Sequence, residues 1–402
     1  EEQRFYPNET LASHLLGYVG QITDVELESY ANQGYYSGDW IGKSGIERVY
    51  DPGLHGKDGG YLIEVDVRGR HKRILQHVPP QAGRDQALDL VDHTLCRVGP
   101  PDAATRRRHG GKALAEAYPS ARAVFEEADE ALGFDISKLC FEGPDDQLKL
   151  TENTQPALLT VSVAAWTVLK EAGFTPHLVA GHSLGEYSAL VAAGSLKFAD
   201  AVRLVRNRGR YMQEAVPAGV GAMAAILKPP LAELDRILEE ARQGEVVQAA
   251  NFNSPDQMVI AGHAAAVARA SEKLKAAGAK RAVPLPVSAP FHCDLMKPAQ
   301  QRLAADLEAT PFADLAVPLV NNVDARLITT GAEARDGLYR QVPNSVRWTE
   351  SVKLLEAEAV TRAVEVGAGK VLCGLVKQIA PSIQTVNFGA PDDLEAVRTL
   401  LS

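Results

Sequence analysis

The first 90 residues contain segments in which polar and apolar side chains alternate with the period of a β-strand. The clearest run is YLIEVDV at residues 61–67, in which every second side chain is aromatic or β-branched. Such alternation is typical of a strand with one buried face. The flanking sequences, DGG at 58–60 and RGR at 68–70, are turn signals. We therefore expect residues 1–90 to form a small α+β or β module.

From residue 112 onward, apolar residues recur at helical spacing, and short apolar runs separate the helices. Strands that alternate with helices are typical of a parallel sheet with crossover helices. The expected helices cover 120–133, 155–173, 184–193, 351–358 and 370–379, and the expected strands cover 177–180, 317–321 and 363–366. The predicted fold class is therefore α/β, with a hydrolase-like parallel sheet core.

Residues 219–288 carry a second pattern inside the first. Strands are expected at 222–227, 246–250, 258–261 and 282–287, and helices at 231–242 and 264–277. The order βαββαβ is that of a ferredoxin-like unit. Because the alternating pattern resumes after it, we expect this unit to be an inserted subdomain.

Residues 97–111 show no apolar periodicity and include the basic run RRR at 106–108. We interpret residues 91–111 as an irregular junction. The expected domains are thus 1–90, the junction, and 112–402.

Composition narrows the function classes. The 402 residues include 42 Lys and Arg against 51 Asp and Glu, a formal net charge of −9, which argues against a nucleic-acid partner. The four cysteines are far apart in the sequence, so neither a disulfide framework nor a zinc site is expected. No apolar run reaches the roughly 20 residues of a membrane span. The chain starts at Glu1 rather than Met, which favours a fragment.

The sequence GHSLG at 181–185 matches the pattern G-x-S-x-G between an expected strand and an expected helix. That context is typical of a nucleophile elbow, which exposes the serine at the carboxyl end of the strand. Ser183 is the candidate nucleophile, and the backbone N–H of Leu184 at the helix N-terminus can stabilise an oxyanion. A glycine-flanked helix cap is the alternative interpretation.

A serine hydroxyl needs a base. His182 is adjacent but is expected to point away across the turn. His292 follows the last strand of the inserted unit and is the candidate base, although a lone histidine is more often structural. Arg208 is a candidate for holding a carboxylate in bidentate fashion, against the alternative of a solvated helix face.

Several segments together resemble malonyl-CoA:acyl-carrier-protein transacylases. The resemblance runs from about residue 112 to the C-terminus, with its motifs in order. They are TQPAL at 154–158, GHSLGEYSAL at 181–190, the stretch 208–214, NFNSP at 251–255, PVS at 286–288 with FH at 291–292, NNVD at 321–324 and VGAGK at 366–370.

The resemblance implies roles for the candidate residues. Ser183 would take the malonyl group as an ester, and His292 would be the general base. This family orients its histidine with a backbone carbonyl, which maps to Gln341. Arg208 would clamp the malonyl carboxylate.

Two more residues belong to the implied substrate site. Asn251 would lie near the active site. Phe291, directly before the histidine, goes with malonyl rather than methylmalonyl units in related polyketide acyltransferases.

The implied reaction is malonyl transfer from malonyl-CoA to the phosphopantetheine thiol of acyl carrier protein, with ping-pong kinetics, in fatty acid biosynthesis. The enzyme itself would need no cofactor, because the partner carries the phosphopantetheine. The expected location is the cytoplasm, where these substrates occur.

The chain departs from this family at one place. A Gly-Gln-Gly-Ser-Gln loop, whose Gln supplies the second oxyanion N–H, should fall at 101–105, where the chain has PDAAT. Loss of one such donor typically costs about 10²–10³ in rate. We therefore expect impaired activity.

Residues 1–90 resemble the non-catalytic pedestal of elongation-type class B penicillin-binding proteins, which is periplasmic. The matching segments are GYVG at 17–20, GKSGIERVY at 42–50, LHGKDG at 54–59 and VPPQAG at 78–83. No KTG motif occurs in the chain, so no β-lactam binding is expected. Because the two resemblances demand different compartments, a chimaera is the hypothesis.

Two alternatives remain open. One is an α/β-hydrolase thioesterase, which would need an acid supporting His292 and no carboxylate clamp. The other is an inactive chimaera that carries a cell-wall scaffold module.

Overall fold

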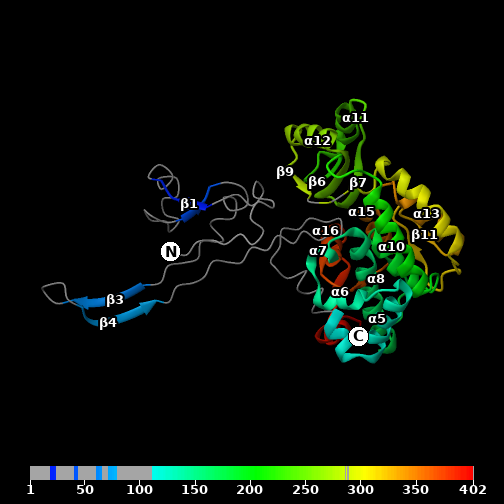
Figure 1. Ribbon diagram of the computed structural model, residues 1–402, viewed down its shortest axis with the longest axis horizontal. Helices are drawn as coiled ribbons and strands as arrows, with labels where there is room; N and C mark the ends of the chain where they lie inside the picture. Colours follow the sequence, from blue (N-terminus) through cyan, green and yellow to red (C-terminus); the bar gives the residue numbers. More distant parts are fainter. Residues whose placement is uncertain are drawn as a thin grey trace. The chain divides into compact units, whose positions relative to one another are not determined.

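The computed structural model describes two compact units. The described residues are 19–23, 40–43, 60–65, 71–78, 111–285, 287 and 289–401. In the first unit, β1 (Val19–Gln21) pairs antiparallel with β2 (Trp40–Gly42), and β3 (Gly60–Val65) pairs antiparallel with β4 (His71–Val78) (Figure 1). The strand expected at 61–67 corresponds to β3.

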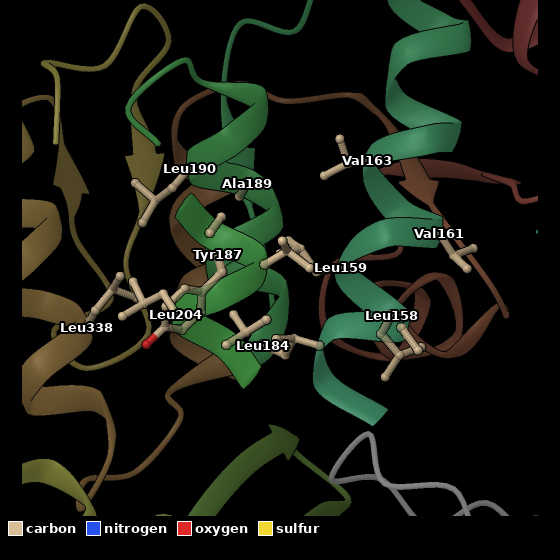
Figure 2. Close-up of a cluster of buried hydrophobic side chains, with 14 of the residues drawn as sticks. Leu158, Leu159, Val161, Val163, Leu184, Tyr187, Ala189, Leu190, Leu204 and Leu338 are labelled. Atoms are coloured by element: carbon tan, nitrogen blue, oxygen red, sulfur yellow. The ribbon is translucent and has the colours of Figure 1, made fainter. Parts of the chain in front are cut away.

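The second unit is built around long helices. Its central helix, α8 (Thr151–Glu171), packs against α5 (Pro119–Leu132), α9 (Leu184–Ala192) and α10 (Phe198–Glu214). Figure 2 shows leucines of α8 and α9 meeting in this core, together with Leu204 of α10. A helix that is apolar on most of its surface is buried, and α8 has this character.

The start of α8 differs from the prediction. The helix begins at Thr151 rather than at Gln155, and Pro156 lies inside it. A proline in a helix removes one backbone hydrogen bond, so a start beside it was expected. Side chains hold the earlier turn instead, since Thr151 N donates to Gln213 Oε1 at 3.0 Å and Thr154 Oγ1 donates to the Leu148 carbonyl at 2.6 Å.

The parallel strand pairs of the second unit lie in two separate small sheets within the described residues. In one, β10 (Leu319–Val320) is parallel to β5 (Val179–Ala180) and antiparallel to β11 (Leu327–Ile328). In the other, β12 (Arg362–Val366) is parallel to β13 (Gln384–Phe388). The strands β11 and β13 were not predicted.

An antiparallel sheet with two helices forms a further group, drawn at the top of Figure 1. Its strand order is β7-β8-β6-β9. The strands are β6 (Gly221–Leu227), β7 (Val247–Ser254), β8 (Gln257–His263) and β9 (Arg281–Leu285), and the helices are α11 (Leu234–Arg242) and α12 (Ala264–Ala276). The elements follow the order strand, helix, strand, strand, helix, strand, and they enclose their own apolar core.

The remaining helices cover the second unit. They are α6 (Ile136–Glu142), α7 (Asp145–Leu148), α13 (Lys297–Ala309), α14 (Gly331–Gln341), α15 (Trp348–Ala357), α16 (Val371–Ile379) and α17 (Leu394–Leu401), with helical residues also at 111–117 and 3₁₀ turns at Leu231–Glu233, Asp294–Met296 and Pro391–Asp393. The sequence pattern did not predict α6, α7, α13, α14 or α17. A capping box of Thr330 and Glu333 marks the start of α14.

The chain thus has a mixed α/β structure, as predicted. Within the described residues, no helix combines the length and the apolar composition needed to cross a membrane.

Candidate active site

A strained turn between β5 and α9 presents Ser183. The residue has φ 50° and ψ −102°, a conformation that non-glycine residues rarely adopt and that is characteristic of functional sites. A Cβ on Gly181 would lie 2.0 Å from the carbonyl oxygen of Gly185. Glycine at position 181 is therefore required for the turn to close, as expected for a nucleophile elbow.

The hydroxyl of Ser183 contacts the imidazole of His292. The Oγ atom lies 2.8 Å from Nε2, and Nδ1 of the same ring lies 3.0 Å from the backbone carbonyl of Gln341. A carbonyl oxygen only accepts hydrogen bonds, so Nδ1 carries the proton. In the neutral ring Nε2 is then an acceptor aimed at the serine hydroxyl.

The environment of His292 keeps it neutral. The side chain is buried, with 1% of its surface exposed. Burial, followed by the positive charge of Arg208, lowers the pKa of His292 to about 3. A histidine that is unprotonated at neutral pH can accept a proton.

Arg208 places a positive charge beside the nucleophile. It projects from α10 and is 2% exposed. Its Nη1 donates to Gln155 Oε1 at 2.7 Å, and its Nη2 donates to Gln341 Oε1 at 2.9 Å and to Ser183 Oγ at 3.1 Å. These acceptors are uncharged, so a carboxylate at this position meets a cation that two amides hold in place.

Three residues of this cluster were missed as functional candidates. Asn322 Oδ1 accepts from Ser183 N at 2.6 Å, and Asn322 Nδ2 donates to the Gly181 carbonyl at 2.7 Å. Glu186 Oε2 accepts from Asn322 N at 3.1 Å and from Gln341 Nε2 at 2.8 Å. The third is Gln155. All three lie in the segments that carry the family resemblance, which was the available signal.

Glu186 is a buried carboxyl group. Its side chain is fully enclosed, and burial raises its pKa from 4.5 to about 7 against the lowering effect of its hydrogen bonds. The two hydrogen bonds on Oε2 tie α9 to the chain after β10 and to the end of α14.

His182 points elsewhere, as expected. Its Nε2 lies 3.1 Å from Asn253 Oδ1, and its ring lies 5.6 Å from that of Trp348. Burial lowers the pKa of His182 to about 4, so it is a neutral, packed residue.

The other predicted residues take different places. Leu184 is the first residue of α9, and Phe291 is buried in the main core. Asn251 is buried on β7, and neither its Oδ1 nor its Nδ2 has a hydrogen-bond partner within the described residues. The structure thus brings Ser183, His292, Arg208 and Gln341 into one hydrogen-bonded cluster and gives no such contact for Asn251 or Phe291.

Two predictions concern other parts of the chain. In the part of the chain that the structure describes, no group of three or more His, Cys, Asp or Glu side chains is arranged to hold a metal ion. The substitution of the loop at 101–105 lies outside the described residues.

Comparison with known families divides the chain in two. Residues 107–386 match the family described as the acyl transferase domain. Residues 1–88 match the penicillin-binding protein dimerisation domain.

Individual proteins match the longer part closely. The malonyl CoA-acyl carrier protein transacylase of Salmonella typhimurium is 52% identical over 287 residues, which cover 71% of this chain and 93% of that protein. The protein of the same name from Bacillus subtilis is 50% identical over 292 residues, 72% of this chain and 92% of its own length.

Solved structures agree with these relatives. An acyl carrier protein S-malonyltransferase from Vibrio cholerae superposes with a TM-score of 0.70 at 48% identity, covering 71% of this chain and 94% of that one. A malonyl-transacylase in complex with a type II PKS acyl-carrier protein superposes with a TM-score of 0.70 at 47% identity, covering 72% and 94%.

Proposed function

The chain belongs to the acyl transferase family, and on that premise we propose that it transfers a malonyl group from malonyl-CoA to the phosphopantetheine thiol of acyl carrier protein in fatty acid biosynthesis. The observation that carries this proposal is the position of Arg208, whose Nη2 lies 3.1 Å from the Oγ of Ser183. A cation beside the nucleophile favours an acyl group that ends in a carboxylate.

In the first half-reaction, Ser183 Oγ attacks the thioester carbonyl of malonyl-CoA while its proton passes to Nε2 of His292. The negative oxygen of the tetrahedral intermediate lies against the backbone N–H of Leu184 at the start of α9. The carbon–sulfur bond then breaks, and the imidazolium returns its proton to the sulfur of CoA. The Gln341 carbonyl stabilises the imidazolium while it exists.

In the second half-reaction, the phosphopantetheine thiol gives its proton to His292 and attacks the serine ester. The carbon–oxygen bond breaks, and the proton returns to Ser183. Arg208 holds the malonyl carboxylate throughout, with Asn251 and Phe291 as further substrate contacts. These reaction steps use no cofactor resident in the protein, and their substrates place the reaction in the cytoplasm.

The geometry favours transfer over hydrolysis by a thioesterase. His292 is oriented by a backbone carbonyl at 3.0 Å, whereas the thioesterase alternative needs an acid in that position. The buried cation beside Ser183 likewise has no use in a hydrolase for uncharged acyl chains.

We also propose the finer architecture and the domain limits. The strand order β7-β8-β6-β9 supports a ferredoxin-like subdomain at 219–288. The parallel pairs β5 with β10 and β12 with β13 support a hydrolase-like sheet core. The proposed limits are 1–90 for the penicillin-binding-protein-like fragment, 91–111 for the junction and 112–402 for the transacylase-like domain.

The replaced loop at 101–105 leads us to propose that transfer is slow in this chain. A single missing oxyanion donor typically lowers the rate by about 10²–10³. Replacing PDAAT by GQGSQ should raise the rate of malonyl loading, measured as CoA release. An unchanged rate counts against this part of the proposal.

Mass spectrometry of the intact chain after mixing with malonyl-CoA tests the function. We expect a malonyl adduct on Ser183 that disappears when acyl carrier protein bearing phosphopantetheine is added. The Ser183→Ala chain is the control and should carry none. Absence of an adduct on the unaltered chain refutes the proposal and favours the inactive chimaera.

A further inference from the structure

Glu186 has no part in the reaction steps above, yet it is buried at the centre of the site. Its Oε2 accepts from Gln341 Nε2 at 2.8 Å and from Asn322 N at 3.1 Å. Its Oε1 is buried and has no hydrogen-bond partner among the residues that the structure describes. A carboxyl group is costly to bury, so its presence here calls for a role beyond packing.

Gln341 is the residue through which Glu186 can act. Its backbone carbonyl accepts from His292 Nδ1 at 3.0 Å. Its side-chain Oε1 accepts from Arg208 Nη2 at 2.9 Å, and its Nε2 donates to the Ser183 carbonyl at 3.0 Å as well as to Glu186. One glutamine therefore contacts the nucleophile's backbone, the base and the cation.

We propose that Glu186 is a positioning residue that fixes the amide orientation of Gln341, and so holds the Arg208 guanidinium where it selects acyl groups that carry a carboxylate. This inference rests on the proposed function. It assigns Glu186 an effect on substrate choice that is exerted through Gln341.

The reason lies in the polarity of the amide. A glutamine amide has one acceptor end and one donor end. Because Oε2 of Glu186 accepts a hydrogen bond, the donor end of Gln341 faces Glu186 and the acceptor end faces Arg208. In the flipped orientation, the amide nitrogen would face the guanidinium, where two donors meet and no hydrogen bond forms.

The same oxygen also holds the elbow. It accepts the backbone N–H of Asn322, whose Oδ1 accepts the N–H of Ser183 at 2.6 Å. The acceptor role survives protonation, since a proton on Oε1 leaves Oε2 free to accept. Burial raises the pKa of Glu186 to about 7, and the nearby charges of Arg208 and Asp324 act on it in opposite directions.

The test compares malonyl-CoA with acetyl-CoA, which lacks the carboxylate. Glu186→Leu removes the acceptor and Glu186→Gln keeps one. We expect Glu186→Leu to lower the ratio of kcat/KM for malonyl-CoA to that for acetyl-CoA by about 10²-fold, as a displaced binding group does. Any loss that comes from the elbow affects both thioesters and cancels in this ratio. Glu186→Gln should restore the preference for malonyl-CoA.

A double variant shows whether the effect passes through Gln341. If it does, adding Glu186→Leu to a Gln341→Ala chain should lower the malonyl-to-acetyl ratio of kcat/KM little further than Gln341→Ala lowers it alone, because the effects of coupled residues are not additive. Additive losses, equal losses with both thioesters, or a lost preference in Glu186→Gln each overturn the proposal. Leu169→Ala, at the opposite end of α8 from Gln155, is a control for general destabilisation and should leave the preference intact.

Equilibrium binding separates this inference from the proposed function. Calorimetry of malonyl-CoA and acetyl-CoA is carried out on the Ser183→Ala chain, where no transfer occurs. Tighter binding of malonyl-CoA that is lost in Ser183→Ala/Glu186→Leu and kept in Ser183→Ala/Glu186→Gln supports the role of Glu186, even if the unaltered chain transfers nothing. Equal binding of the two thioesters to the Ser183→Ala chain overturns it.

Discussion

The Nδ1 atom of His292 lies 3.0 Å from the backbone carbonyl of Gln341. A neutral backbone acceptor therefore sets the tautomer of this imidazole. The arrangement orients the base with a neutral group, whereas a carboxylate in that position would form an ion pair with Arg208 and compete for the cation.

The low pKa of His292 makes the stability of the chain depend on pH. The folded value is about 3 against 6.5 for an ordinary histidine, so the unfolded chain binds a proton between these values and the folded chain does not. This contribution is complete above pH 6.5 and is lost as the pH falls toward 3. Between pH 6.5 and 4.5 the unaltered chain should lose about 2 kcal/mol more free energy of unfolding than His292→Gln. Urea denaturation at each pH measures this, and parallel curves contradict it.

Glu186 should produce the opposite slope. Its pKa is raised from 4.5 to about 7, so its contribution is fully present below pH 4.5 and is lost as the pH rises through 7. Glu186→Gln cannot ionise, and its stability relative to the unaltered chain should therefore rise by about 3 kcal/mol between pH 4.5 and pH 8. Urea denaturation is again the measurement, with the exposed Glu130→Gln as the matched control. A constant difference across this range is the result that speaks against a buried, titrating Glu186.

Arg208→Ala should abolish the preference for malonyl-CoA over acetyl-CoA. A hydrogen bond to a charged group contributes about 1.5–3 kcal/mol, so the ratio of kcat/KM values should fall by roughly 10- to 100-fold. Arg208→Lys should recover little of it, because an ammonium group lacks the planar fork of the guanidinium. Arg203→Ala, which alters an exposed arginine of the same helix beside Asp200, is the control. A thioesterase for uncharged acyl chains would be indifferent to the loss of Arg208.

The two glycines of the elbow should respond differently to a methyl group. A Cβ on Gly181 would meet the backbone of Gly185 at 2.0 Å, whereas one on Gly185 would meet no described atom within 4 Å. Gly181→Ala should therefore destabilise the chain by several kcal/mol, since overpacking against backbone forces it to shift. Gly185→Ala should change the melting temperature little. Similar melting temperatures for the two variants would show that the backbone of Gly185 does not crowd position 181.

Local features of the sequence were enough to predict much of the fold. The strands and helices of the antiparallel group were expected at 222–227, 231–242, 246–250, 258–261, 264–277 and 282–287, and β6, β7, β8, β9, α11 and α12 lie within a few residues of those limits. The predicted start of α8 was wrong, because distant side chains such as Gln213 hold the first turn of this helix. The helix propensities of the residues near Pro156 cannot predict this contact with Gln213.

The residues of the site also divide into those that the sequence predicted and those that it did not. The elbow around Ser183 was predicted because its glycines, its strand and its helix are neighbours in the sequence. His292 and Arg208 were candidates from their residue types. The resemblance to a family assigned their roles and added the backbone of Gln341, and the structure brings these residues together with the serine. Glu186 and Asn322 lay within the same segments, and no role was predicted for either.

The sequence by itself determined many of the helices and strands of this protein and the residue types available at the site, because helix period, strand alternation and turn chemistry act between residues close in the chain. Only the tertiary structure decided which polar group faces which. Glu186 meets the amide of Gln341 across 155 residues, and it meets Asn322 across 136. Burial then sets the proton affinity of Glu186 and His292, and burial exists only after these segments have packed.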